Sequence, residues 1–218
     1  MSQSSFSWDL FNAMPLVGIL RNVSEDDVHF ILPIFKEAGF TTIEVTLNTP
    51  GATSMISALA SQYNGALNIG AGTVCGMSDL DEALAAGASF IVTPIVKKEV
   101  IKKCVDKGVP IFPGALSPTE IFDAWELGAS MIKLYPASAV GPAYVSAILA
   151  PLPNIKIMPT GGIHLSNMLA FMKSGSAALG IGSELFDKKI IQSRDKVALL
   201  NHFKLFTQQM QLSKIAIY

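Results

Sequence analysis

The chain has 218 residues and a mass of 23.2 kDa, and its 16 basic and 17 acidic side chains give a formal net charge of −1. This near neutrality, without a block of Lys and Arg, argues against nucleic-acid binding. Hydrophobic residues make up 50% of the chain and charged residues 15%, against about 25% charged in an average domain. Such a composition excludes a disordered or fibrous protein. No linker or composition shift divides the chain, so we expect one domain over residues 1–218.

The high hydrophobic content raises the question of a membrane. The uncharged segment 134–155 is long enough to span one, but four prolines interrupt it: Pro136, Pro142, Pro151 and Pro153. A lipid-facing helix so interrupted would leave backbone groups without hydrogen bonds. Residues 1–20 contain no Lys or Arg and so lack the positive start of a secretory signal. We therefore expect no membrane association and a cytoplasmic location.

Cysteine and histidine give no sign of a metal or a disulfide. Cys75 and Cys104 have no CxxC spacing and no histidine cluster beside them, so we expect two buried thiols. The three histidines share no ligand spacing. The sequence therefore predicts no metal and no cofactor.

Eight short apolar runs rich in β-branched residues recur along the chain, and their starts are separated by about 20 to 26 residues. This interval accommodates a strand, a loop and about three turns of helix. The runs predict strands at 16–20, 42–46, 67–71, 90–93, 110–112, 131–134, 155–159 and 177–181.

The segments between these runs have helix signals. Ser24 with Asp27 resembles a capping box with the shorter acid, and Gly39 supplies the stop. The same plan of polar start and glycine stop recurs at 78–87, 97–108 and 117–128. Apolar strands alternating with helices predict a parallel sheet covered on its outer face. At this length we expect a single (β/α)8 TIM barrel of the α/β class, with a doubly wound open sheet as the alternative.

Two extensions fall outside the repeat. Residues 7–14 carry Trp8, Phe11 and Met14, which predicts a short N-terminal helix that closes the bottom of the barrel. Residues 184–210 carry a stripe of Leu199, Phe203, Phe206 and Met210, so this segment should pack against the first helix.

Two charged residues stand inside predicted strands, Glu44 and Lys133. Active sites of barrels lie at the C-terminal ends of the strands. The lysine is either a strand-end side chain that reaches water or a desolvated amine that attacks a carbonyl group. The glutamate alone is equally consistent with a structural ion pair. Together they provide the groups that carbinolamine formation, dehydration and carbon–carbon cleavage require.

Glycines follow the last two predicted strands, at Gly161 and Gly162 and again at Gly182, beside Ser183. Barrels commonly bind phosphate after these strands, because glycine lets backbone N–H groups approach the anion. Tight turns use the same residues. Arg21 ends the first strand and is a candidate partner for a substrate carboxylate or phosphate, with a salt bridge at the rim as the alternative.

Five segments, in this order and spacing, resemble those of the 2-keto-3-deoxy-6-phosphogluconate (KDPG) and 4-hydroxy-2-oxoglutarate aldolases. The resemblance covers residues 10–210 and implies a homotrimeric (β/α)8 barrel and a metal-independent aldolase that forms a Schiff base. The segments are Glu44-Val45-Thr46-Leu47, Gly70-Ala71-Gly72-Thr73-Val74, Phe112-Pro113-Gly114, Lys133-Leu134-Tyr135-Pro136 and Pro159-Thr160-Gly161-Gly162-Ile163.

The resemblance also implies roles for individual residues. Lys133 takes the place of the Schiff-base lysine, Glu44 of the proton-transferring glutamate, and Thr73 of the residue that holds the pyruvyl carboxylate. Tyr135 replaces an aromatic residue, usually Phe, beside the imine, and Pro113 is a further substrate-binding position. The implied phosphate-binding groups are Gly161, Gly162, Gly182 and Ser183.

Two positions give conflicting signals about the substrate. Asn48 stands where the best-known KDPG members have arginine, and it resembles the 6-phosphogalactonate branch, as does the segment 136–142. Thr160 instead resembles the phosphogluconate branch, where a threonine contacts the C4 hydroxyl group. The C4 epimer therefore stays open, and Arg21 is the candidate for the missing cationic contact.

The implied reaction cleaves a 2-keto-3-deoxy sugar acid phosphate to pyruvate and glyceraldehyde 3-phosphate, and activity on 4-hydroxy-2-oxoglutarate is a further expectation. One alternative is another phosphate-binding barrel enzyme, such as an epimerase or thiamin phosphate synthase, which does not need the strand lysine as a nucleophile. The other is a sugar-phosphate-binding regulator without catalysis, which the presence of both Glu44 and Lys133 disfavours.

Overall fold

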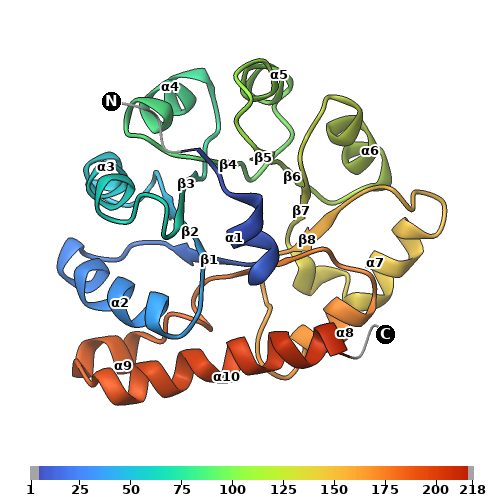
Figure 1. The fold of residues 1–218 in the computed structure, drawn as a ribbon. Coiled ribbons are helices and arrows are strands. Elements are labelled where there is room, and N and C mark those ends of the chain that lie inside the picture. The colour runs from blue at the N-terminus through green and yellow to red at the C-terminus, as the bar shows by residue number, and fades with distance from the viewer. Residues whose placement is uncertain (1–4, 216–218) are drawn as a thin grey trace.

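The structure is a computed structural model that describes residues 5–215, with strands at the centre and helices around them (Figure 1). All strand pairs are parallel. The strands are β1 Leu16–Leu20, β2 Thr42–Thr46, β3 Asn68–Gly72, β4 Ile91–Val92, β5 Ile111–Phe112, β6 Gly114–Ala115, β7 Ile132–Leu134, β8 Ile157–Pro159 and β9 Leu179–Ile181. The helices are α1 Trp8–Ala13, α2 Glu25–Glu37, α3 Ala52–Gln62, α4 Met77–Ala85, α5 Lys98–Asp106, α6 Pro118–Glu126, α7 Pro142–Leu149, α8 Met168–Lys173, α9 Lys188–Ser193 and α10 Lys196–Ile215, with a 3-10 turn at Ala137–Ala139.

The strands form two sheets, one of six strands in the order β5-β4-β3-β2-β1-β9 and one of three in the order β6-β7-β8. A single parallel bridge joins them, between Thr160 and Gly180. The predicted α/β class, with parallel strands alternating with helices, is confirmed. A single sheet closed over eight strands is not shown, because the strands form two sheets. The predicted strand at 110–112 corresponds to β5, and the strand continues past its predicted end as β6, divided from β5 at Pro113.

Pro113 divides this strand because proline has no backbone N–H to donate to a ladder. Its carbonyl still accepts from Lys133 N at 2.9 Å, and Ile111 O accepts from Ser130 N at 3.1 Å. The backbone from β5 to β6 therefore stays beside β7 even where the strand assignment is interrupted.

The predicted helix starts at Ser24 and Ser117 carry side-chain caps, whereas α4 begins after Gly76 and α5 after Lys97, both without a side-chain cap. Ser24 caps α2 by accepting from Asp27 N, and Ser117 caps α6 in a full capping box with Glu120. Gly39 follows α2 with a φ of +95°, a left-handed conformation that glycine adopts without strain.

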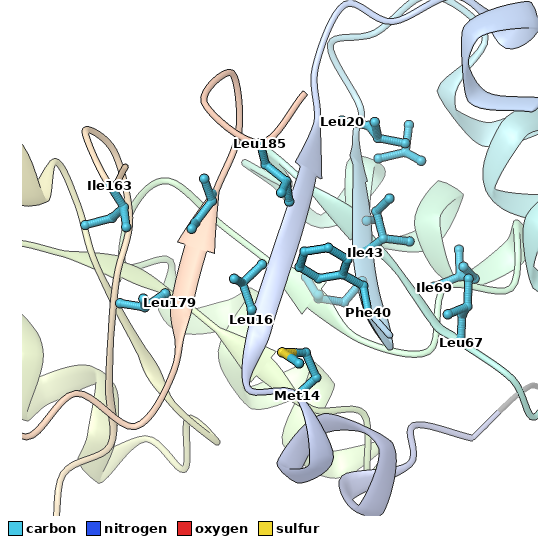
Figure 2. Close-up of a cluster of buried hydrophobic side chains, with 14 of the residues drawn as sticks. Met14, Leu16, Leu20, Phe40, Ile43, Leu67, Ile69, Ile163, Leu179 and Leu185 are labelled. Carbon is cyan, nitrogen blue, oxygen red and sulfur yellow. The ribbon is translucent and has the colours of Figure 1, made fainter. Parts of the chain in front are cut away.

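Most of the apolar side chains pack between the sheets and the helices. Leu16, Ile43 and Leu179, from three neighbouring strands, are all fully buried there, and Figure 2 shows them in one layer. The C-terminal helix α10 covers this layer, because the Phe203 ring lies 5.8 Å from the Phe35 ring of α2. This contact confirms that the C-terminal stripe packs on the first helix that follows a strand.

A second, inner apolar cluster lies on the other face of the strands, and it consists of Phe11, Val17, Phe90, Val92, Phe112, Met131, Met158 and Ala178. Helix α1 contributes Phe11, whose ring lies 5.9 Å from Phe112. Asn68 anchors the helix start by accepting from Ser7 N at 2.8 Å and donating to Ser7 O at 2.9 Å. The predicted N-terminal helix is thus present and packs beneath the strands (Figure 1).

Within residues 5–215, no helix combines the length and apolar character that crossing a membrane requires.

Candidate active site

Glu44 and Lys133 point to the inner side of the strands. Successive side chains of a strand point to opposite faces, and the neighbours of both residues, such as Ile43 and Ile132, belong to the helix-facing core. Glu44 is 1% exposed and Lys133 is 3% exposed. The two charged side chains predicted from the sequence are therefore buried on the inner face.

The Glu44 carboxyl group is buried without hydrogen bonds. Neither of its oxygens has a partner among the residues that the structure describes. Burial raises the pKa of Glu44 above its ordinary value, although the charges of Lys133 and Arg21 partly oppose this shift. A Cβ atom at Gly72 would lie 2.5 Å from Glu44 Oε1, so glycine at position 72 leaves the space that the carboxyl group occupies.

The Lys133 amine is shifted in the opposite direction. Burial lowers the pKa of Lys133, the charge of Glu44 raises it in part, and the charge of Arg21 lowers it further. The Lys133 Nζ atom lies 5.2 Å from the centroid of the Tyr135 ring, within the range of a cation–π contact. A larger fraction of neutral, nucleophilic amine is therefore present near neutral pH than for a lysine in water.

A cavity of about 540 Å³ opens at the C-terminal ends of β1, β7, β8 and β9. Its volume lies in the range typical of small-molecule sites. It brings together eight of the residues that the sequence predicts for the site, namely Arg21, Lys133, Tyr135, Thr160, Gly161, Gly162, Gly182 and Ser183.

The loop after β8 presents Gly161 and Gly162 to this cavity with φ angles of +89° and +77°. Asn167 holds the loop, because its Nδ2 donates to Gly162 O at 2.8 Å and its Oδ1 accepts from His164 N at 2.9 Å. On the other side, Ser138 N donates to Gly161 O at 3.0 Å. Asn167 was not predicted from the sequence, although Asn is a residue whose side chain commonly bonds to the backbone of a turn.

Four predicted residues do not line this cavity: Glu44, Thr73, Asn48 and Pro113. Glu44 is linked to it through its charge interactions with Lys133 and Arg21. Thr73 follows β3 directly, with a φ of +59° that is uncommon for a residue with a side chain. Asn48 is exposed in the turn after β2, and Pro113 is buried between β5 and β6.

The cavity wall also contains residues that sequence reasoning did not identify, including Asn22, Asp27, Lys188 and Gln192. These side chains lie in the loop after β1 and in helices α2 and α9, where no interruption of an apolar run marks them. Their place in the site depends on how α2 and α9 pack beside β1 and β9.

No group of three or more His, Cys, Asp or Glu side chains that could hold a metal ion occurs among residues 5–215. Both cysteines are free thiols. Cys104 is buried, which raises its pKa to about 12, but Cys75 is exposed. The prediction of two buried thiols is therefore wrong for Cys75, because this residue lies in the loop after β3 and not on a strand or helix.

Parallel strands with a buried amine, a buried carboxyl group and a glycine-lined cavity at their C-terminal ends define an α/β enzyme equipped for carbonyl chemistry. The family model described as KDPG and KHG aldolase matches residues 9–201. The 2-dehydro-3-deoxy-6-phosphogalactonate aldolase of Escherichia coli (strain K12) is 36% identical over 174 residues, which cover 79% of this chain and 85% of the relative. The 2-dehydro-3-deoxy-phosphogluconate aldolase of Treponema pallidum (strain Nichols) is 36% identical over 167 residues, which cover 75% of this chain and 79% of the relative.

A solved structure adds a chemical parallel. The KDPG aldolase of Legionella pneumophila, with pyruvate captured as a covalent carbinolamine intermediate, superposes with a TM-score of 0.82 at 26% identity, covering 89% of this chain and 95% of that one. The chain belongs to the KDPG and KHG aldolase family. It is therefore an aldolase, a carbon–carbon lyase.

Proposed function

We propose that the chain cleaves a 2-keto-3-deoxy-6-phospho sugar acid, the gluconate or its galactonate epimer, to pyruvate and glyceraldehyde 3-phosphate through a Schiff base on Lys133. The observation that carries this proposal is the buried Lys133 amine, which has a lowered pKa and whose charge interacts with that of the buried Glu44 carboxyl group.

The reaction begins when the neutral Lys133 amine attacks the C2 ketone of the substrate. Glu44 transfers the protons that convert the carbinolamine into a protonated imine and release water. Glu44, as carboxylate, then removes the proton of the C4 hydroxyl group. The C3–C4 bond breaks, its electron pair enters the imine to form an enamine, and glyceraldehyde 3-phosphate leaves. Protonation of the enamine at C3 and hydrolysis of the imine release pyruvate and restore Lys133.

The raised pKa of Glu44 suits a group that both gives and accepts protons, because its acid and base forms then lie closer in free energy near neutral pH. Burial also keeps water away from the imine and strengthens its interactions with nearby charges.

The remaining predicted residues take binding roles in this proposal. The backbone at Gly161, Gly162 and Gly182 and the side chain of Ser183 bind the phosphate group, because all four line the cavity. Arg21, Thr73, Tyr135, Asn48 and Pro113 are the proposed contacts to the rest of the substrate. Thr73 is assigned to the pyruvyl carboxylate, since it follows Gly72, against which the Glu44 carboxyl group packs.

Trapping with borohydride tests the proposed chemistry. Incubation with pyruvate and borohydride, followed by digestion and peptide mass measurement, should show a reduced pyruvyl adduct on Lys133. Lys156→Met serves as the control, and Lys133→Met should remove the adduct. An absent adduct would contradict the Schiff base and favour a different phosphate-binding enzyme or a non-catalytic regulator. The cleavage should also survive EDTA, because we propose that neither a metal nor a cofactor takes part.

Sequence identity does not distinguish the two C4 epimers of the substrate, because the galactonate and gluconate relatives are each 36% identical to this chain. Cleavage of both substrates must therefore be measured and compared directly. Thr160 is 3% exposed and lines the cavity. If its hydroxyl group contacts the C4 hydroxyl of the substrate, Thr160→Val should shift the ratio of kcat/KM values toward the galactonate. An unchanged ratio would refute this role. Cleavage of 4-hydroxy-2-oxoglutarate should be measured in the same series.

We also propose that the two sheets act as one (β/α)8 barrel, supported by the backbone contacts across Pro113 and the Thr160 to Gly180 bridge.

The proposed assembly is a homotrimer in the cytoplasm. Native mass spectrometry should give three times the 23.2 kDa chain mass, and cell fractionation should recover the enzyme without membranes. A monomer in solution would contradict the trimer.

A further inference from the structure

An acidic side chain lines the same cavity as the residues proposed to bind the phosphate group. Asp27, in the first turn of α2, lines the same cavity as Ser183 and the glycine loops. A carboxylate in this place repels a phosphate dianion. The other acidic residue of the wall, Glu184, is exposed, so water screens its charge, whereas the Asp27 side chain is only 27% exposed.

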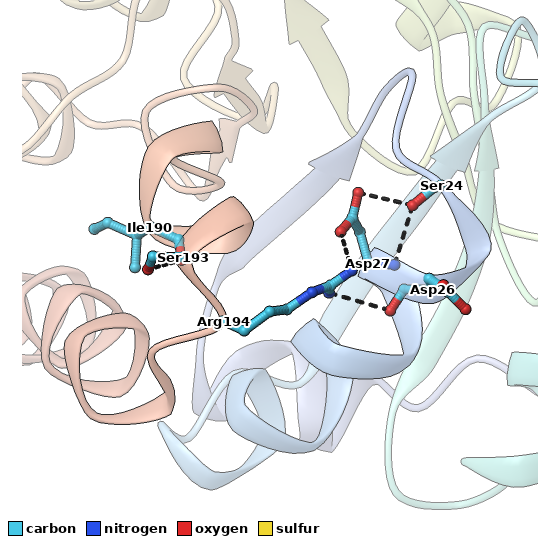
Figure 3. Close-up of polar contacts among 6 residues, drawn as sticks. All are labelled: Ser24, Asp26, Asp27, Ile190, Ser193 and Arg194. Atoms are coloured by element: carbon cyan, nitrogen blue, oxygen red, sulfur yellow. Dashed lines mark hydrogen bonds and ion pairs between the residues drawn. The ribbon is translucent and has the colours of Figure 1, made fainter.

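Both carboxylate oxygens of Asp27 are occupied. Arg194 Nη2 lies 2.8 Å from Asp27 Oδ1, and Ser24 Oγ donates to Asp27 Oδ2 at 2.7 Å. Figure 3 shows the guanidinium group reaching from the segment after α9 to the start of α2. The ion pair therefore holds the carboxylate against a positive charge.

The guanidinium group is itself held in place. Arg194 Nη1 donates to Asp26 O at 3.4 Å, and the guanidinium carbon lies 5.1 Å from the centroid of the Phe30 ring. Arg194 also ends α9 in a left-handed conformation, with a φ of +56°. Helix α9 contributes Lys188 and Gln192 to the cavity wall, so the ion pair connects two walls of one cavity.

We propose that Arg194 is a positioning residue for substrate binding: by compensating the charge of Asp27, it allows a dianionic phosphate group to enter the cavity. This inference rests on the proposed function, since it requires a phosphorylated substrate. Arg194 is not assigned a contact with the substrate or with the reacting atoms.

The test is a double-mutant cycle measured by kcat and KM for the phosphorylated substrate. Arg194→Met leaves Asp27 uncompensated and should raise KM roughly three- to tenfold, the effect of one uncompensated charge in the same water-accessible cavity as an anion. The value of kcat should change less than about twofold, because the reacting atoms are elsewhere. Adding Asp27→Asn to Arg194→Met removes the repulsion and should restore KM.

The matched control is Lys97→Met. It breaks the ion pair between Lys97 Nζ and Glu99 Oε1, which are 3.0 Å apart and lie outside this cavity, so KM should stay unchanged. An unchanged KM in Arg194→Met overturns the inference. A double variant as impaired as the single variant overturns it as well, because loss of structure would then explain the effect. Trapping of pyruvate on Lys133 is measured in parallel: if the wild-type chain gives no adduct, the proposed function fails, whereas an adduct with an unchanged KM refutes only the role of Arg194.

Discussion

Glu44 and Lys133 are two buried ionisable groups whose surroundings favour their neutral forms. Removal from water raises the pKa of the carboxyl group and lowers that of the amine, and Arg21 lowers both. The interaction between Glu44 and Lys133 opposes these shifts only in part. Near neutral pH the neutral amine and the protonated carboxyl group are therefore each more accessible than they would be for the same side chains in water.

The two neighbouring charges should shift the titration of Lys133 in opposite directions. Glu44→Gln removes a negative charge that stabilises the ammonium form, so the pKa of Lys133 should fall further. Arg21→Met removes a positive charge that destabilises it, so this pKa should rise. We expect the midpoint of the pH profile for borohydride trapping of pyruvate to move by on the order of one pH unit, down in Glu44→Gln and up in Arg21→Met. Shifts in the same direction would show that these charges do not control Lys133.

The glycine loop offers a second test at the level of single residues. Gly162 has a φ of +77°, and a Cβ atom there would lie 2.5 Å from Ser138 Cβ. Gly39 has a φ of +95° with nothing within 4 Å of its Cβ position, so Gly39→Ala is a control for backbone strain alone. We expect Gly39→Ala to lower the free energy of unfolding by about 1–2 kcal/mol. Gly162→Ala should cost a further 1–3 kcal/mol, roughly, from the clash.

Urea unfolding measures both losses, and initial rates measure KM for the phosphorylated substrate. KM should rise in Gly162→Ala only, since Gly39 lies outside the cavity. Equal losses in the two variants would mean that Ser138 moves aside without cost.

The sequence reveals some residues of the site and hides others for physical reasons. Glu44 and Lys133 are visible because a charge inside an apolar strand is costly to bury and is therefore rare there. Asp27 and Arg194 are not visible, because exposed charges in helix ends are common and their pairing depends on how α2 and α9 pack. Arg21 was recognised by its place at the end of β1, but its effect on both buried groups became clear only from the structure.

At the scale of elements, strands with a strong apolar pattern were located accurately. The predicted strands at 16–20 and 42–46 coincide with β1 and β2. The division at Pro113 was not predicted, because Gly114 and Ala115 have little intrinsic preference for strands and β6 forms only through pairing with β7. A Cβ atom at Gly114 would lie 2.5 Å from the backbone of Pro94. Position 114 therefore requires glycine, because a side chain would not fit between the two backbone segments.

The ends of β1 and β2 are connected by buried hydroxyl groups. Thr49 Oγ1 accepts from Asn22 N at 3.0 Å and lies 3.1 Å from Thr46 Oγ1, which donates to Leu20 O at 3.2 Å. Asn22 has a φ of +52°, so this contact stabilises an unusual backbone conformation directly after Arg21.

Removing the Thr49 hydroxyl group should weaken this connection. Thr49→Val keeps the size of the side chain but leaves Asn22 N–H without its acceptor, and we expect a loss of about 1–3 kcal/mol in the free energy of unfolding. Thr49→Ser keeps the hydroxyl group and should lose only about 0.8 kcal/mol for one buried methyl group. Urea unfolding compares the two variants. A serine variant less stable than the valine variant would indicate that packing, not hydrogen bonding, holds the strand ends.

At the scale of the whole molecule, inner packing and chemistry are separated along β1 and β7. The inner apolar cluster includes Val17 near the start of β1 and Met131 just before β7, whereas the cavity is lined by Ile19 further along β1, by Arg21 directly after it and by Lys133 within β7. The sequence predicted this division through the aromatic residues of the N-terminal helix and the glycines after the last strands. How the two sheets meet was not predictable, since it depends on single backbone contacts such as the bridge between Thr160 and Gly180.

This separation predicts that the inner cluster can be weakened without changing the active site. Phe11 is 1% exposed and Trp8 is 37% exposed, although both belong to α1. Phe11→Ala should lower the free energy of unfolding by about 3–5 kcal/mol through the cavity it leaves, and Trp8→Ala should cost less because its ring already contacts water. Urea unfolding measures the difference, and kcat and KM measured well below the unfolding temperature should stay at wild-type values in both variants. A changed KM in Phe11→Ala would show that packing beneath the strands reaches the catalytic end, and equal stability losses would show that burial does not determine what each ring contributes.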